Sequence, residues 1–180
     1  MAVHLALIRG INLAGTRKVP MENLRAFATR LGLAPARTIL QSGNLIFRSP
    51  RRPAALEKLL ESESEKRLGL KTEFFVRTLD EWKAIIAANP FPSEARNDPS
   101  HLLVVFLKDG PTPEHYRALR AAYTGPEVIL PGGRQAYATY PAGIADSRLS
   151  TALIDRTLGT RATARNWNTV LKMAALAGSL

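Results

Sequence analysis

The sequence predicts an α+β fold, a tandem duplication of ferredoxin-like β-α-β-β-α-β units with antiparallel sheets and a C-terminal helix. Two observations support this. The order strand, helix, hairpin, helix occurs twice along the 180 residues, and a chain of this length with 46% hydrophobic residues can bury a sizeable core. We therefore expect two ferredoxin-like halves, residues 1–77 and 100–180, joined by a helix and a proline-rich linker over residues 78–99.

The first half begins with a strand and a helix. Residues 3–8 are apolar and rich in strand formers, and they end just before Gly10. Pro20 suits the first turn of a helix, and apolar residues recur after it at helical spacing. Gly32 can adopt the left-handed conformation that ends a helix. The pattern predicts a strand over residues 3–8 and a helix between Pro20 and Gly32.

A hairpin is predicted next. Ser42-Gly43 forms its two-residue turn, between strands over residues 37–41 and 44–48. This register places Ile39 opposite Ile46, so apolar residues pair across the two strands.

The first unit is completed by a second helix and a fourth strand. Pro53 opens this helix and Gly69 ends it, and a strand follows over residues 72–77. Residues 78–81, Thr-Leu-Asp-Glu, match a capping box that starts a further helix through residue 89. Three prolines over residues 90–100 predict a loop.

The second half repeats this order. It contains a strand over residues 102–107, a helix opened by Thr112-Pro113, and a hairpin around Gly132-Gly133. A helix over residues 147–158 follows. No clear counterpart of the fourth strand is visible, so the prediction replaces it with a helix over residues 166–177.

Three polar motifs lie at the ends of these elements: Arg9-Gly10-Ile11-Asn12, Gln41-Ser42-Gly43-Asn44 and Arg165-Asn166-Trp167-Asn168-Thr169. A right-handed crossover would bring the first two to the same edge of the sheet, and amides beside arginine suit an oxygen-rich ligand. In an alternative interpretation, Asn12 only hydrogen-bonds its own loop and Asn166 caps a helix. The candidate ligand-binding residues are Arg9, Asn12, Arg17, Lys18, Gln41, Ser42, Asn44, Arg165, Asn168 and Lys172.

The three motifs resemble those of a bacterial family, domain-of-unknown-function family 1697. Its members begin with Leu-Arg-Gly-Ile-Asn-Val-Gly-Gly after a strand, carry a Gln-Ser-Gly-Asn hairpin and end with Ala-Arg-Asn-Trp-Asn-Thr. Here the first motif reads Ile8-Arg9-Gly10-Ile11-Asn12-Leu13-Ala14-Gly15, so Ala14 replaces the first glycine of the pair. The resemblance covers essentially the whole chain. It implies the tandem ferredoxin-like fold and no particular activity.

The formal net charge of +10 fits a nucleic acid or another polyanion as partner. Residues 1–50 carry seven basic groups and one acid, residues 51–110 carry ten of each, and residues 111–180 carry eight and four. The excess therefore lies in the segments that hold the motifs. Codon usage is the alternative, because 18 arginines against 7 lysines are typical of a GC-rich coding sequence.

The sequence gives little support for catalysis. The absence of cysteine excludes thiolate nucleophiles and thiolate metal sites, and none of His4, His101 and His115 has a partner at fixed spacing. Ser42 lacks the strand-turn-helix context of a nucleophile elbow. We therefore predict no catalytic residue, no metal site and no cofactor.

The expected location is the cytoplasm, without a membrane partner. The first residues lack the basic region and cleavage pattern of a signal peptide, and no apolar run approaches the roughly 18 residues of a membrane span. The sequence favours a protein that binds a phosphate-bearing or other anionic ligand, with RNA or DNA as candidates. The alternatives are an enzyme acting on a nucleotide-like small molecule, or motifs that form only a domain or dimer seam. The oligomeric state is left open.

Overall fold

The computed structural model describes residues 1–12 and 18–180. Residues 13–17, which include Ala14 and the candidate residue Arg17, lie outside the described residues. The chain divides into two compact units, residues 1–84 with 172–180, and residues 85–171.

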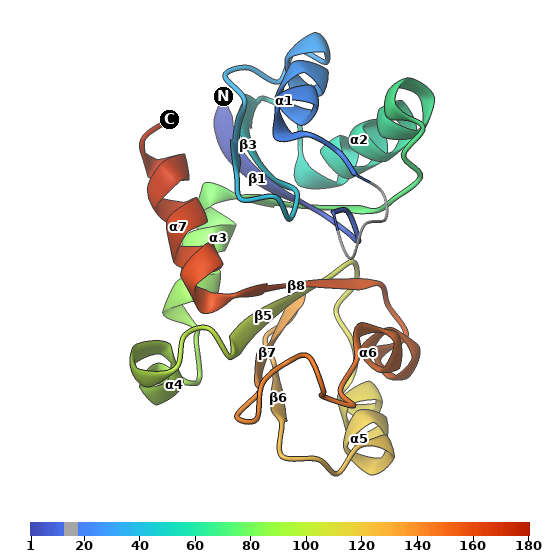
Figure 1. Cartoon of the computed structure of the whole chain (residues 1–180), viewed down its shortest axis with the longest axis vertical. Coiled ribbons are helices and arrows are strands. Elements are labelled where there is room, and N and C mark those ends of the chain that lie inside the picture. The colour runs from blue at the N-terminus through green and yellow to red at the C-terminus, as the bar shows by residue number, and fades with distance from the viewer. Residues whose placement is uncertain (13–17) are drawn as a thin grey trace. The chain divides into compact units, whose positions relative to one another are not determined.

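The first unit has a sheet covered on one face by two helices (Figure 1). Phe27 and Leu60, one from each helix, are buried in one cluster with Phe47 of the sheet. Its elements are β1 (Ala2–Ile8), α1 (Met21–Arg30), β2 (Arg37–Ile39), β3 (Asn44–Ser49), α2 (Pro53–Leu68) and β4 (Phe74–Thr78), and α3 (Leu79–Ala87) follows and ends in the second unit.

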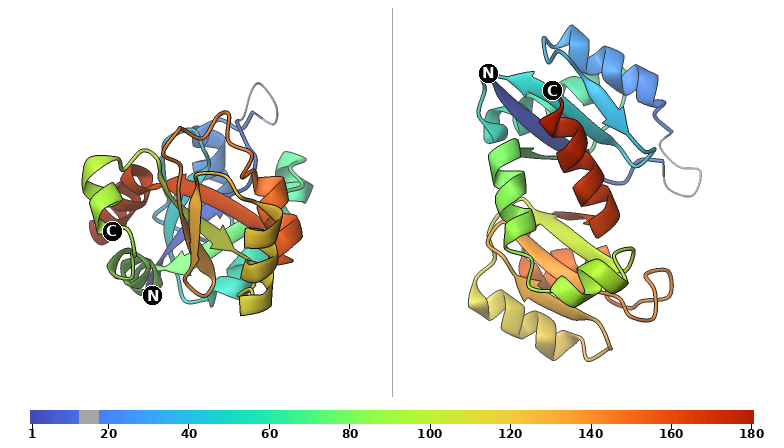
Figure 2. Two further views of the ribbon diagram at one scale, coloured as in Figure 1. Left: turned by 90° about the horizontal axis from the view of Figure 1, so that it is seen from below. Right: turned by 90° about the vertical axis from the view of Figure 1, so that its left-hand side faces the viewer.

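The second unit has the same design. Two helices lie side by side on one face of its sheet (Figure 2), and Leu119 and Ile154 from these helices share a buried cluster with Val105. Its elements are α4 (Pro92–Asn97), β5 (Leu102–Leu107), α5 (Pro113–Ala122), β6 (Val128–Pro131), β7 (Gln135–Thr139), α6 (Thr151–Leu158), β8 (Ala162–Asn166) and the first residues of α7 (Trp167–Gly178).

The two sheets have equivalent topologies. The strand orders are β2-β3-β1-β4 and β6-β7-β5-β8, and all pairs are antiparallel. The two units also share an equivalent backbone hydrogen bond at the end of their first strands. The N–H of Ile8 at the end of β1 donates to Gly43 O at 2.9 Å, and the N–H of Leu107 at the end of β5 donates to Arg134 O at 3.0 Å. The predicted tandem duplication of ferredoxin-like α+β units is therefore confirmed.

Three local predictions are wrong. Residues 162–166 form β8, so a helix does not replace the last strand but follows it, as α3 follows β4. The alanine-rich strand carries little β propensity of its own, and its pairing with β5 decides its conformation. The predicted loop over residues 90–100 contains the short helix α4.

The third wrong prediction concerns the hairpin. Ile39 pairs with Asn44 instead of Ile46, so residues 40–43 form a four-residue connection in which Leu40 has a φ of 59°. The register differs from the prediction by two residues. Because side chains alternate with a period of two, each residue still faces the predicted side of the sheet.

Carboxylates cover the outer edge of β4. Its outward N–H groups at Phe74 and Val76 donate to Glu61 at 2.9 Å and to Glu57 at 2.8 Å, both carboxylates belonging to α2. The N–H of Thr78 donates to Glu81 at 2.7 Å, which completes the predicted capping box of α3. Pairing these donors blocks the edge against an additional strand.

Candidate polar edge of the first unit

The ends of β1 and of the β2–β3 connection meet at one edge of the first sheet. Besides the bond between Ile8 and Gly43, the side-chain amide of Asn12 donates to the carbonyl of Gln41 at 2.6 Å. The structure thus brings together the first two polar motifs, as the crossover rule predicts. We call this group of residues, Arg9, Asn12, Lys18 and residues 41–44, the polar edge.

Asn12 fixes the loop that starts the polar edge. Its Nδ2 donates to Val19 O at 3.1 Å as well as to Gln41 O, and its Oδ1 accepts from the N–H of Val19 at 2.8 Å. Its φ of 55° lies in the left-handed region, which asparagine tolerates better than most residues. Both amide donors are engaged, so the Asn12 side chain holds the two loops together.

Asn44 closes the connection between β2 and β3. It is 0% exposed, and its Nδ2 donates to Ile39 O at 2.9 Å and to Ser42 Oγ at 3.0 Å. Ser42 is therefore held from within the turn, while the Gln41 side chain is exposed to solvent. Asn44 positions this turn from inside the protein.

The charged residues of the polar edge differ in exposure. Lys18 is exposed, whereas Arg9 is half-buried. The Arg9 backbone joins the start of β4: its N–H donates to Glu73 O at 3.1 Å, and its carbonyl accepts from Thr72 Oγ1 at 2.6 Å. Lys18 and Gln41 are thus the most accessible polar side chains here.

The third motif spans the end of β8 and the start of α7. Arg165 is only 9% exposed and donates to Ala164 O at 2.8 Å, and burial lowers its pKa to about 10, so it stays charged at neutral pH. Asn166 accepts from the N–H of Thr169 at 3.0 Å, which confirms its role as an N-cap. Asn168 and Lys172 are exposed, and Lys172 belongs to the segment grouped with the first unit.

Replacing Asn12 by alanine should lower the free energy of unfolding by about 2 kcal/mol, because one hydrogen bond between the two loops and two bonds to Val19 within its own loop are lost. Asn44→Ala should cost a similar amount. Gln41→Ala is the matched control: its carbonyl, not its exposed side chain, receives the Asn12 bond, so stability should change by less than about 0.5 kcal/mol. Urea unfolding measures all three. Unchanged stability of both asparagine variants would contradict the positioning role.

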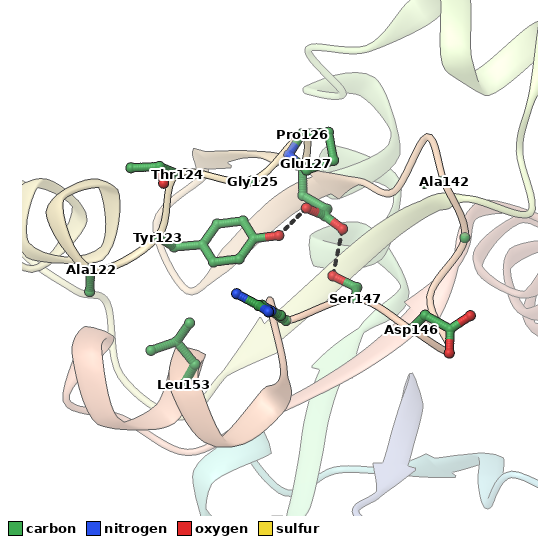
Figure 3. A pocket seen from close by; sticks show the side chains of 12 residues that line it. Ala122, Tyr123, Thr124, Gly125, Pro126, Glu127, Ala142, Asp146, Ser147 and Leu153 are labelled. Carbon is green, nitrogen blue, oxygen red and sulfur yellow. Dashed lines mark hydrogen bonds between the residues drawn. The ribbon is translucent and has the colours of Figure 1, made fainter.

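Sequence reasoning missed a pocket in the second unit. It has a volume of about 590 Å³ and lies between the segment after α5 and the segment before α6 (Figure 3). Tyr123 donates to one oxygen of Glu127, and Ser147 donates to the other at 2.6 Å. No sequence signal marks this pocket, because Glu127 and Ser147 are twenty residues apart in irregular segments.

Two further features bear on function. Within residues 1–12 and 18–180, no helix is long and apolar enough to cross a membrane. In the same part of the chain, no three acidic or histidine side chains are grouped closely enough to hold a metal ion.

Comparisons with known proteins identify a family and a fold. A family model described as protein of unknown function (DUF1697) matches residues 1–137. The solved structure of a conserved bacterial protein from Streptococcus pneumoniae is similar, with 22% sequence identity, a TM-score of 0.72 and coverage of 98% of each chain. At this identity the similarity shows the fold alone. A search of curated proteins found no match.

Proposed function

We propose that this chain, which belongs to the DUF1697 family of proteins of unknown function, binds a phosphate-bearing ligand at the polar edge of its first unit. The observation that carries the proposal is the direct bond between the two loops, from the Asn12 amide to Gln41 O at 2.6 Å. It fixes neighbouring polar groups before any ligand arrives, and such preorganisation lowers the entropic cost of binding.

The chemistry of the polar edge supports an anionic ligand. Lys18 offers an exposed ammonium group, and Gln41 offers an exposed amide with two N–H donors. Arg9 places a further positive charge at the same edge. Charge-assisted hydrogen bonds from such groups are the usual means of holding phosphate oxygens.

The charge distribution favours a nucleic acid as the source of the phosphate. The first fifty residues carry seven basic groups and one acid, a net charge of +6. Each phosphate that a protein neutralises releases condensed counterions, so affinity for a polyanion falls steeply as salt rises. A nucleotide offers the same phosphate chemistry without this strong dependence.

We expect the chain to bind a single-stranded RNA or DNA oligonucleotide, with log K falling linearly with log salt concentration. Arg17→Ala with Lys18→Ala should weaken binding and reduce the salt slope by about 1 for each phosphate that the variant no longer neutralises. Fluorescence anisotropy at several salt concentrations measures both quantities.

The control for this experiment removes the same charge elsewhere in the unit. Lys66 and Arg67 both pair with Glu63 on α2, so Lys66→Ala with Arg67→Ala lowers the net charge equally without touching the polar edge. Equal losses of affinity in the two double variants would show that only total charge matters. Absence of binding by RNA, DNA and ATP at low salt would overturn the proposal.

A further inference from the structure

The open pocket of the second unit is lined in part by a three-residue hydrogen-bond network that we call the clasp, Tyr123, Glu127 and Ser147 (Figure 3). The clasp joins the segment after α5 to the segment before α6. Ser147 Oγ also accepts from the N–H of Leu149 at 3.1 Å, and the buried Tyr140 donates its hydroxyl to Leu149 O at 3.0 Å. Both walls of the pocket are thus fixed by hydrogen bonds.

Glu127 gives the pocket a stable negative charge. Burial opposes its ionisation, but the hydrogen bonds from Ser147 and Tyr123 outweigh burial and lower its pKa below the ordinary value. Each carboxylate oxygen accepts one of these bonds and keeps capacity for a second donor. At neutral pH the group can therefore accept a hydrogen bond from a ligand ammonium.

Tyr123 provides an aromatic wall whose position depends on Gly125. A Cβ at residue 125 would lie 2.0 Å from the Tyr123 hydroxyl oxygen and 2.4 Å from Cζ, so a side chain there would displace the phenol ring. Leu153 adds an apolar side chain to the lining. The pocket thus offers apolar contact beside its charged groups.

Arg148 supplies the positive charge of the pocket. It is exposed and lines the cavity, and it forms no hydrogen bond or ion pair with the described residues. The hydrogen bond to Glu127 is the main cause of the raised pKa of Tyr123. The positive charge of Arg148 acts in the opposite direction and lowers this pKa. Five N–H donors of its guanidinium are available to an anionic group.

We propose that this pocket binds a small zwitterion of the amino-acid class, with its ammonium on Glu127 and its carboxylate on Arg148. The fixed carboxylate of Glu127 would repel a ligand with only negative charge, and the guanidinium of Arg148 would repel a ligand with only positive charge. A zwitterion satisfies both groups and can place its side chain against Tyr123 and Leu153. The volume of about 590 Å³ falls in the range of small-molecule sites and exceeds the needs of an amino acid.

The test uses three probes that share a phenyl group: L-phenylalanine, 2-phenylethylamine and 3-phenylpropionate, titrated into the full chain by calorimetry. L-Phenylalanine should bind at least about tenfold more tightly than either analogue, the factor expected for one charge-assisted hydrogen bond. Arg148→Gln should reduce affinity for L-phenylalanine about tenfold and should not weaken the binding of 2-phenylethylamine, which loses a repulsive neighbour. Glu127→Gln should reduce affinity for L-phenylalanine and the amine and should not weaken the binding of 3-phenylpropionate, which loses a repulsive neighbour.

Glu114→Gln is the matched control, because this exposed carboxylate of α5 pairs with Arg117 and does not line the pocket, so its loss should leave affinity unchanged. A melting curve of each variant shows whether the protein remains folded, and Arg148→Gln replaces no residue of the clasp. Either analogue binding as tightly as L-phenylalanine overturns the proposal. Absence of binding by L-phenylalanine at about 10 mM also overturns it, because this concentration would nearly saturate a site with a Kd of about 1 mM. Neither result affects the polar edge, which lies in the other unit.

Discussion

Replacing Glu57 by alanine should lower the free energy of unfolding by about 3 kcal/mol, the largest effect we expect from loss of a polar side chain. Glu57 is 7% exposed and lies on α2, where it accepts from the N–H of Val76 at 2.8 Å and sits 3.7 Å from the guanidinium of Arg77. Arg77 is itself only 2% exposed. Removing one partner of a buried ion pair leaves a poorly compensated charge, which costs about 3–5 kcal/mol.

Glu63→Ala on the same helix is the matched control. Glu63 pairs with Lys66 and Arg67, whose side chains are exposed to solvent, and such pairs contribute little to stability. Both variants introduce alanine into α2, so their helix propensities change equally. Thermal melts should show a fall of about 10 °C for Glu57→Ala and a far smaller change for Glu63→Ala. Similar falls in both would show that the buried pair does not stabilise the first unit.

Gly43→Ala should also destabilise the chain by about 3 kcal/mol. Gly43 has a φ of 77°, and a Cβ there would lie 2.6 Å from Cδ1 of Ile11 and 3.0 Å from Cβ of Ile8. Left-handed backbone costs a non-glycine residue about 1–2 kcal/mol, and forcing extra volume into a packed core costs about 1–3 kcal/mol more. Urea unfolding should detect the sum.

Gly10→Ala separates these two contributions. Gly10 has a φ of 63°, but nothing lies within 4 Å of a Cβ added there. The free energy of unfolding of this variant should therefore fall by only about 1 kcal/mol, the cost of a left-handed backbone at a non-glycine residue. If Gly43→Ala and Gly10→Ala lose equal stability, then Ile8 and Ile11 move aside at little cost, and the close packing under the turn is not rigid.

The sequence by itself determined the order and kind of most elements, because their signals are local. A proline in the first turn fixes the start of α2, and Gly69 ends it with a φ of 61°. Thr78 and Glu81 form the capping box that their spacing predicts. The meeting of the end of β1 with the β2–β3 connection was also predictable, since the handedness of the crossover leaves one arrangement.

Tertiary structure decided the register of the hairpin and the existence of β8. The apolar pattern allows either register, and the bond from buried Asn44 to Ile39 O accompanies the four-residue connection. In β8, Ala162 and Ala164 carry no strong strand preference, and pairing with β5 supplies the missing hydrogen bonds. Both outcomes depend on partners distant in sequence, which a local pattern does not specify.

The roles of the polar residues were decided in the same way. The sequence identified Asn12 as a residue of interest, but its three bonds to Val19 and Gln41 exist only once both loops are in place. The clasp of Tyr123, Glu127 and Ser147 left no sequence signal, because Ser147 comes from a different irregular segment than the other two. Composition and periodicity report which side chains are available, whereas hydrogen-bond partners are set by the folded backbone that carries them.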